Sequence, residues 1–176
     1  MQISEILFPD LCLLGEQATS RKKALQIVAQ VLEQYQPELD SFYILKSLIS
    51  REQLGSTAIG NGVALPHGRI QGCQQPVAVL LHLETGVDFA APDEEGVDLI
   101  FCLLVPPEYD FQKLGGLNQI VEIFQNKILR AQMRNAHNGE ALYDIMHRAL
   151  IHCQKDEQAK TNSSTNLGTD NETSHS

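Results

Sequence analysis

The densest group of chemically useful residues lies between residues 50 and 69. Three glycines, Gly55, Gly60 and Gly62, fall within eight residues, and Asn61 stands between the last two. Glycine and asparagine are the residues that most readily reach left-handed backbone conformations. In turns of that kind, successive backbone N–H groups can converge on an anion. The segment therefore predicts a loop that binds an anion such as phosphate.

Four side chains in the same segment could complete a phosphate site. Ser56 and Thr57 carry hydroxyl donors, and Arg51 carries a planar guanidinium that matches the geometry of phosphate oxygens. His67 follows a proline and precedes a glycine. A neutral imidazole is a good nucleophile, and the phosphoramidate that it forms is labile enough to pass the phosphoryl group on. We therefore predict that His67 and Arg51 are catalytic, and that Ser56, Thr57 and the Gly60-Asn61-Gly62 turn bind phosphate.

Other phosphate-binding motifs do not fit this segment. No Gly-Lys-Ser/Thr follows the glycines, so it is not a Walker loop, and no G-x-G-x-x-G opens a helix. Each element taken singly has an ordinary interpretation: a histidine in a turn, a surface arginine at position 51, a Gly-Asn-Gly turn. Their combination within one short segment favours a functional site.

Composition limits the classes of partner. The chain has 176 residues, 43% of them hydrophobic, with 13 Lys and Arg against 22 Asp and Glu, a net charge of −9. These values indicate one globular domain and argue against a nucleic acid or an anionic membrane surface as the main partner. The first ten residues contain neither a basic region nor a long apolar stretch, so neither a signal peptide nor membrane insertion is expected. We predict a cytoplasmic protein.

Cysteine spacing gives no sign of a metal site. The four cysteines stand at positions 12, 73, 102 and 153, without a C-x-x-C pair, so neither a metal nor a disulfide framework is predicted. Cys102 lies in an apolar run and is expected in the core. No organic cofactor is implied either.

The composition changes at residue 154. Residues 154–176 are almost entirely polar, with Leu167 as the single large aliphatic residue, so they cannot bury enough apolar surface to offset the entropy of ordering. We predict a folded domain over residues 1–153 and a disordered polar tail over residues 154–176.

Hydrophobic periodicity outlines the elements that must position the site. A short strand over 11–14 precedes a helix that Ser20 caps and Pro37 ends, and a second helix runs from about 41 to 54. A loop over 55–62 and a strand over 63–65 lead to His67. Two nearly continuous apolar strands follow at 76–83 and 97–105, and then three amphipathic segments at 110–126, 128–134 and 138–151. Strands buried on both faces between groups of helices predict an α/β fold with the sheet between two helical layers.

The segment resembles a known family. Residues 55–68, Gly-Ser-Thr-Ala-Ile-Gly-Asn-Gly-Val-Ala-Leu-Pro-His-Gly, with Arg51-Glu52 before them, are similar to the active-site motif of type-2 enzyme IIA domains of the bacterial phosphotransferase system. The likeness extends over about residues 3–150 and is strongest to the nitrogen-regulatory branch. It implies a three-layer α/β/α sandwich around a mixed sheet. It also implies that His67 accepts phosphate from a phosphohistidine carrier protein while Arg51 neutralises the phosphate.

One position departs from the family motif. A second histidine usually follows the Val-Pro end of a strand by about seven residues, and counting on from Val105-Pro106 places Lys113 there. By the resemblance, Lys113 either takes over phosphate binding or is an ordinary surface lysine, in which case phosphotransfer is altered or slow.

Three functions remain open at this point. We predict a phosphoryl-carrier protein of the nitrogen-type system that regulates partners, such as a transporter or a sensor kinase, through the phosphorylation state of His67. Stand-alone sugar-specific enzyme IIA subunits carry a very similar motif. The third alternative is an interaction module that binds such a partner and is not phosphorylated.

Overall fold

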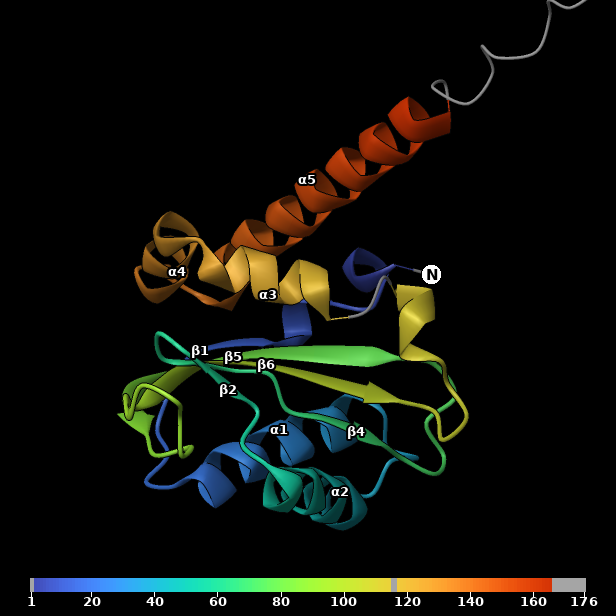
Figure 1. Ribbon diagram of the computed structural model, residues 1–176. Helices are drawn as coiled ribbons and strands as arrows, with labels where there is room; N and C mark the ends of the chain where they lie inside the picture. Colours follow the sequence, from blue (N-terminus) through green and yellow to red (C-terminus); the bar gives the residue numbers. More distant parts are fainter. Residues whose placement is uncertain (1, 115–116, 166–176) are drawn as a thin grey trace, which may run out of the picture.

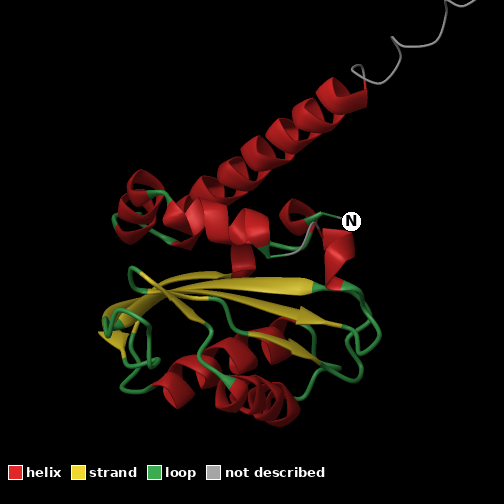
Figure 2. Ribbon diagram, in the orientation of Figure 1, coloured by secondary structure: helices red, strands yellow, loops and turns green. Residues whose placement is uncertain are grey.

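The fold has three layers. The computed structural model describes residues 2–114 and 117–165, and Figures 1 and 2 show a sheet between two groups of helices. Helices α1 and α2 cover one face of the sheet, and α3, α4 and α5 lie on the other side. The predicted α/β/α sandwich is confirmed.

The first helical layer forms where the sequence predicts it. Strand β1 (Cys12–Glu16) precedes α1 (Arg21–Tyr35) and α2 (Ser41–Leu54). Ser20 caps α1 by accepting a hydrogen bond from a backbone N–H in the first turn, and Asp40 caps α2 in the same way. These caps satisfy backbone donors that the helix itself leaves without partners.

The sheet is mixed. Its strands are β1, β2 (Ala58–Gly60), β3 (Val63–Ala64), β4 (His67–Arg69), β5 (Val77–Val87) and β6 (Val97–Val105). The order is β1-β5-β6-β3-β2, with β4 also paired to β6. Strands β3 and β4 both run parallel to β6. They therefore occupy successive stretches of one edge of β6, so the position of a residue along β6 shows which end of the sheet it occupies.

The two central strands are buried on both faces, as predicted. Alternate residues of β5 and β6 enter two separate apolar clusters, one beneath α1 and α2 and one beneath α3 and α5. Cys102 is 1% exposed within the first cluster, which confirms it as a core residue. The sheet is therefore held from both sides and gives a rigid frame for the segments attached to β6.

The second helical layer is divided more finely than the sequence predicted. In place of one segment over 110–126, the structure has a 3-10 helix, η3 (Phe111–Leu114), and then α3 (Asn118–Gln125). Helix α4 (Lys127–Arg134) follows immediately, because the side chain of Asn126 accepts hydrogen bonds from two N–H groups and starts a new helix.

Helix α5 (Gly139–Thr165) is longer than predicted. It continues through residues 154–165, which we expected to be disordered, and projects beyond the body of the domain (Figure 1). Gln154 and Glu157 hydrogen-bond to Ser4 and Gln119, and residues 154–160 are mostly good helix formers. Local propensity therefore extends the helix without apolar burial. The rest of the predicted tail, 166–176, lies outside the described residues.

Despite the length of α5, no helix within residues 2–114 and 117–165 is both long enough and apolar enough to cross a membrane.

Candidate active site around His67

His67 is the first residue of a strand. The structure contains β2 inside the predicted 55–62 loop, and β3 and β4 follow it. His67 pairs with Leu103 on β6, and its strand β4 packs against α2. At Gly68 an added Cβ atom would lie 2.7 Å from the Ser47 hydroxyl of α2, so glycine allows β4 to approach that helix closely. This approach brings the histidine beside the side chains of α2.

Arg51 and His67, the two residues that the sequence analysis selected as candidates for catalysis, are in direct contact. The Arg51 Nε group donates a hydrogen bond to His67 Nε2 at 3.2 Å, and His67 Nδ1 lies 3.0 Å from the Leu65 carbonyl oxygen. An arginine N–H can only donate and a carbonyl can only accept. The imidazole is therefore the neutral tautomer with its proton on Nδ1 and a lone pair on Nε2.

That arrangement leaves one atom able to act as a nucleophile. His67 Nε2 carries the lone pair, the ring is half-buried, and Arg51 places its charge beside the same atom. A second hydrogen bond, 2.9 Å from Arg51 Nη1 to the Gly55 carbonyl, fixes the guanidinium. Among the ion pairs of the described residues, none joins Arg51 to a carboxylate, so its charge remains available to an incoming anion.

Sequence reasoning missed two residues that surround the imidazole. The Phe111 ring meets the His67 ring edge to face at 5.7 Å between centroids. The Arg69 guanidinium lies 4.9 Å from the centre of the Phe111 ring and donates hydrogen bonds to the Pro107 and Tyr109 carbonyls. The Arg-Ile that follows His67-Gly68 gave no such signal, because the contact requires η3 to fold back over β4.

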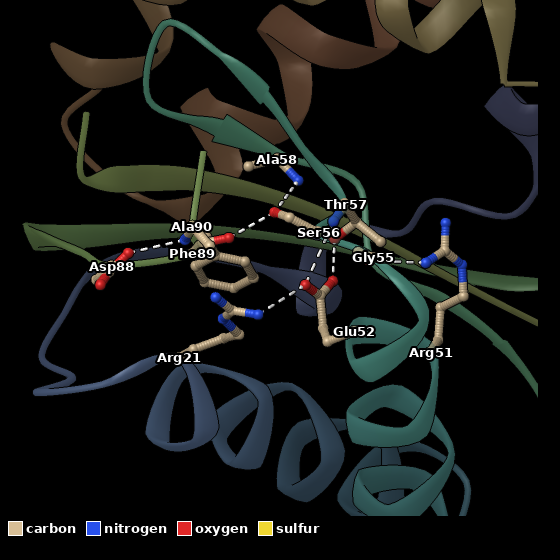
Figure 3. Close-up of polar contacts among 10 residues, drawn as sticks. All are labelled: Arg21, Arg51, Glu52, Gly55, Ser56, Thr57, Ala58, Asp88, Phe89 and Ala90. Carbon is tan, nitrogen blue, oxygen red and sulfur yellow. Dashed lines mark hydrogen bonds and ion pairs between the residues drawn. The ribbon is translucent and has the colours of Figure 1, made fainter. Parts of the chain in front are cut away.

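Ser56 and Thr57 direct their side chains into the protein, as Figure 3 shows. The Ser56 hydroxyl donates to the Phe89 carbonyl at 2.5 Å. The Thr57 hydroxyl donates to the carboxylate of Glu52, and Thr57 is 6% exposed. The structure therefore does not bring these two hydroxyls together with His67, because internal partners already occupy them.

The Gly60-Asn61-Gly62 turn also lies away from His67. The Gly62 carbonyl accepts hydrogen bonds from the N–H groups of Asp98 and Leu99, whereas His67 pairs with Leu103. Five residues of extended strand between Asp98 and Leu103 correspond to about 17 Å. The predicted single loop around one phosphate is thus divided between the two ends of β6.

Protein carboxylates occupy the turn itself. The Asn61 N–H donates to Asp93 Oδ2 at 2.8 Å, and Arg134 donates to the Asn61 carbonyl at 2.7 Å and forms an ion pair with Asp98. Hydrogen bonds from the N–H groups of Asn61 and Glu95 lower the pKa of Asp93. The anion that this turn binds is a side chain of the protein.

Lys113 lies in η3, two residues after Phe111, and its side chain is exposed. Its element therefore reaches the site, but no side-chain contact joins Lys113 to His67 among the interactions of the described residues. A groove beside the imidazole is lined by residues of α2, by His67, Gly68 and Arg69, and by Phe111.

Comparison with known proteins identifies the family of the chain. Residues 5–149 match the family model for the phosphoenolpyruvate-dependent sugar phosphotransferase system, EIIA 2. A nitrogen regulatory protein of Pseudomonas aeruginosa is 40% identical over 146 residues, which cover 83% of this chain and 95% of that protein. The nitrogen regulatory protein of Escherichia coli is 33% identical over 147 residues, covering 83% and 90%. The crystal structure of the nitrogen regulatory protein IIA-Ntr from Neisseria meningitidis has a TM-score of 0.75 and 33% identity, covering 81% of this chain and 97% of that one.

The fold is thus a mixed sheet between helices, with His67 and Arg51 side by side near one end of β6. The chain belongs to the type-2 enzyme IIA family of the phosphotransferase system. Its relatives and its structural neighbour place it in the nitrogen-regulatory branch of that family.

Proposed function

We propose that this protein is a phosphoryl carrier of the nitrogen-type phosphotransferase system. His67 accepts a phosphoryl group from a phosphohistidine carrier protein, and the phosphorylation state of His67 regulates partner proteins such as a transporter or a sensor kinase. The observation that carries the proposal is the pair of hydrogen bonds on the imidazole, to Leu65 and from Arg51.

The transfer step follows from the tautomer. The lone pair on His67 Nε2 forms the new N–P bond, and the N–P bond of the donor breaks, with its electron pair returning to the donor imidazole. The Nδ1 proton stays on His67, where the Leu65 carbonyl stabilises the positive charge that the ring acquires. No proton needs to move.

Arg51 supplies the charge for this step. The transferred group passes through a loose transition state whose negative charge spreads over its oxygens, so positioning and charge neutralisation provide most of the catalysis. When phosphate occupies Nε2, that atom no longer accepts a hydrogen bond from Arg51 Nε. The guanidinium then donates to phosphate oxygens, a geometry that its planar fork suits.

The surroundings of His67 suit a protein donor. Leu54, at the end of α2, is 86% exposed and lines the same groove as the imidazole. We infer that Leu54 contacts the donor protein when the two active sites meet. We place the protein in the cytoplasm, where phosphoenolpyruvate-dependent phosphotransfer between proteins takes place.

Intact mass spectrometry tests the proposal. The protein is incubated with phosphoenolpyruvate, enzyme I and a phosphohistidine carrier protein, in parallel with the nitrogen-type and the sugar-type carriers. We expect the addition of one acid-labile phosphoryl group, faster with the nitrogen-type carrier. Faster labelling by the sugar-type carrier would favour a sugar-specific subunit, and absence of labelling by both would favour the unphosphorylated interaction module.

A further inference from the structure

Arg51 and His67 belong to a closed set of contacts that passes through a buried carboxylate. Glu52, the residue after Arg51, is 6% exposed and lies inside the domain at the end of α2. Its carboxylate accepts hydrogen bonds from the Thr57 hydroxyl, from the Thr57 N–H at 3.3 Å and from Arg21 Nη1 at 3.4 Å. Three donors on one buried carboxylate tie the segment after α2 back onto the helix.

Thr57 is connected to the histidine by two successive backbone contacts. Its carbonyl accepts a hydrogen bond from the Leu65 N–H at 3.0 Å, and the Leu65 carbonyl accepts the Nδ1 proton of His67 at 3.0 Å. Displacement of Thr57 would therefore move the carbonyl that fixes the tautomer of the nucleophile.

The same segment is connected to the arginine. Gly55, two residues before Thr57, offers the carbonyl that accepts the 2.9 Å hydrogen bond from Arg51 Nη1. The Gly55 N–H in turn donates to the Glu52 carbonyl at 3.2 Å. Glu52 thus acts on the arginine through the backbone of the turn and on the histidine through Thr57.

Figure 3 shows why this arrangement suits a phosphate site. Arg51 and Glu52 leave the last turn of α2 in different directions, Arg51 toward Gly55 and Glu52 toward Thr57 and Arg21. A carboxylate that bonded Arg51 directly would hold it firmly but would neutralise its charge. Glu52 instead forms its ion pair with Arg21, so the Arg51 charge is retained.

We propose that Glu52, acting through Thr57, is the positioning residue that holds the Arg51 guanidinium and the His67 imidazole in the relative positions that phosphoryl transfer requires. The proposal rests on the proposed function for its kinetic consequence, but its structural consequence can be measured without any phosphorylation.

The first experiment uses the unphosphorylated protein. Nitrogen-15 NMR reports the Arg51 Nε–H group and the tautomer of His67 in the parent and in Glu52→Gln, Thr57→Val and Thr57→Ser. We expect Glu52→Gln and Thr57→Val to lose the protected Arg51 signal and the single Nδ1–H tautomer. Thr57→Ser keeps the hydroxyl and should retain both.

Asp98→Asn is the matched control. Asp98 also pairs with an arginine, Arg134, but at the other end of β6. That variant should lose stability without changing the Arg51 and His67 signals. Unchanged signals in both Glu52→Gln and Thr57→Val, or equal changes in Asp98→Asn, would overturn the proposal. If Glu52→Gln does not fold, the difference between Thr57→Val and Thr57→Ser decides whether the proposal stands.

The second experiment measures transfer rates in a double-mutant cycle. A small displacement of reacting groups typically costs one to two orders of magnitude, so we expect Glu52→Gln to slow phosphorylation about tenfold or more. In an Arg51→Ala background the same change should have a clearly smaller effect, because its action on the arginine is already lost. Full additivity would contradict the proposal. If the parent accepts no phosphate, the proposed function fails, and the NMR result alone decides the positioning role.

Discussion

The two ends of strand β6 contain the same kinds of residue and differ in what the arginine contacts. At one end, Arg51 lies beside His67, and its hydrogen-bond partners among the described residues are a carbonyl and the imidazole. At the other end, Arg134 forms an ion pair with Asp98, and His82 lies 3.9 Å from the same carboxylate. Both ends have an arginine, a histidine and a glycine-containing segment, but in the part of the chain that the structure describes a carboxylate pairs with Arg134 and none pairs with Arg51.

The comparison distinguishes an arginine that is available to an anion from an arginine in a structural ion pair. An arginine that is held by neutral acceptors keeps its charge for a ligand, whereas one held by a carboxylate stabilises the fold. Residue type and glycine content alone do not separate the two cases. Function and stability should therefore divide between the two ends of β6.

The largest effect is expected at His67. His67→Ala should abolish phosphoryl acceptance, because it removes the atom that carries the lone pair. Intact mass spectrometry after incubation with the donor proteins measures this, and His82→Ala is the control from the other end of β6. Labelling of His67→Ala at the parental rate, or loss of labelling in His82→Ala alone, would place the acceptor elsewhere.

Substitution of Arg51 should affect the rate of phosphoryl transfer, and substitution of Arg134 should affect thermal stability. Removal of one donor to a developing negative charge typically costs about 10²–10³ in rate, so Arg51→Ala should slow transfer by that order with little change in Tm. Arg134→Ala should lower Tm and leave the transfer rate near that of the parent. Stopped-flow transfer assays and thermal unfolding of both variants measure the two quantities. If Arg51→Ala transferred phosphate at the parental rate, Arg51 would be an ordinary surface charge with no role in transfer.

The Gly60-Asn61-Gly62 turn should matter for stability. Gly62 has φ +75°, and an added Cβ atom would lie 2.5 Å from Arg134 Nη2 and 2.8 Å from Asp98 Oδ1. Gly62→Ala combines backbone strain with this clash, so we expect a loss of about 2–3 kcal/mol and a Tm about 6 °C lower. Gly15, with φ +73° and open space around its Cβ position, is the matched control, since Gly15→Ala carries the strain alone. Equal Tm losses in the two variants would mean that the clash is relieved.

A pH dependence of stability is expected from His82. Burial lowers the pKa of His82, an effect that Asp98 opposes and Arg134 reinforces. His82 therefore takes up a proton at a lower pH in the folded chain than in the unfolded chain, where its pKa is near 6.5. The stability that neutral His82 provides is complete above about pH 6.5 and is lost as the pH falls. Urea unfolding at pH 7 and pH 5.5 should show a larger drop for the parent than for His82→Gln. An equal drop in both would remove His82 as the cause.

The smallest effect is expected at Lys113. Its side chain is exposed, and an exposed charge typically contributes about 0–1 kcal/mol, so Lys113→Gln should slow transfer by less than about fivefold. The transfer assay used for Arg51 measures this. A larger loss would show that Lys113 acts on the phosphate in the complex with the donor, as a replacement for the second histidine of the family motif.

The sequence by itself determined most of the main helices and strands, and it selected Arg51 and His67 as candidates. Caps at Ser20 and Asp40, the apolar runs that became β5 and β6, and the order of helices and strands all depend on local propensity and periodicity, which neighbouring residues fix. Arg51 and His67 could be selected because they stand in one short segment with the glycines and hydroxyls, and because the motif around them resembles a family.

The tertiary structure decided which groups are free to act. The hydroxyls of Ser56 and Thr57 are donors in the sequence, but Phe89 and Glu52 take them in the folded chain. The contacts that decide this come from distant segments. Phe111 of η3 packs against the His67 ring, and Asp93, in the loop before β6, accepts a hydrogen bond from the Asn61 N–H. Local sequence patterns report which chemistry a side chain can perform. Contacts across the sheet determine whether a partner already uses that side chain, and so which arginine keeps its charge.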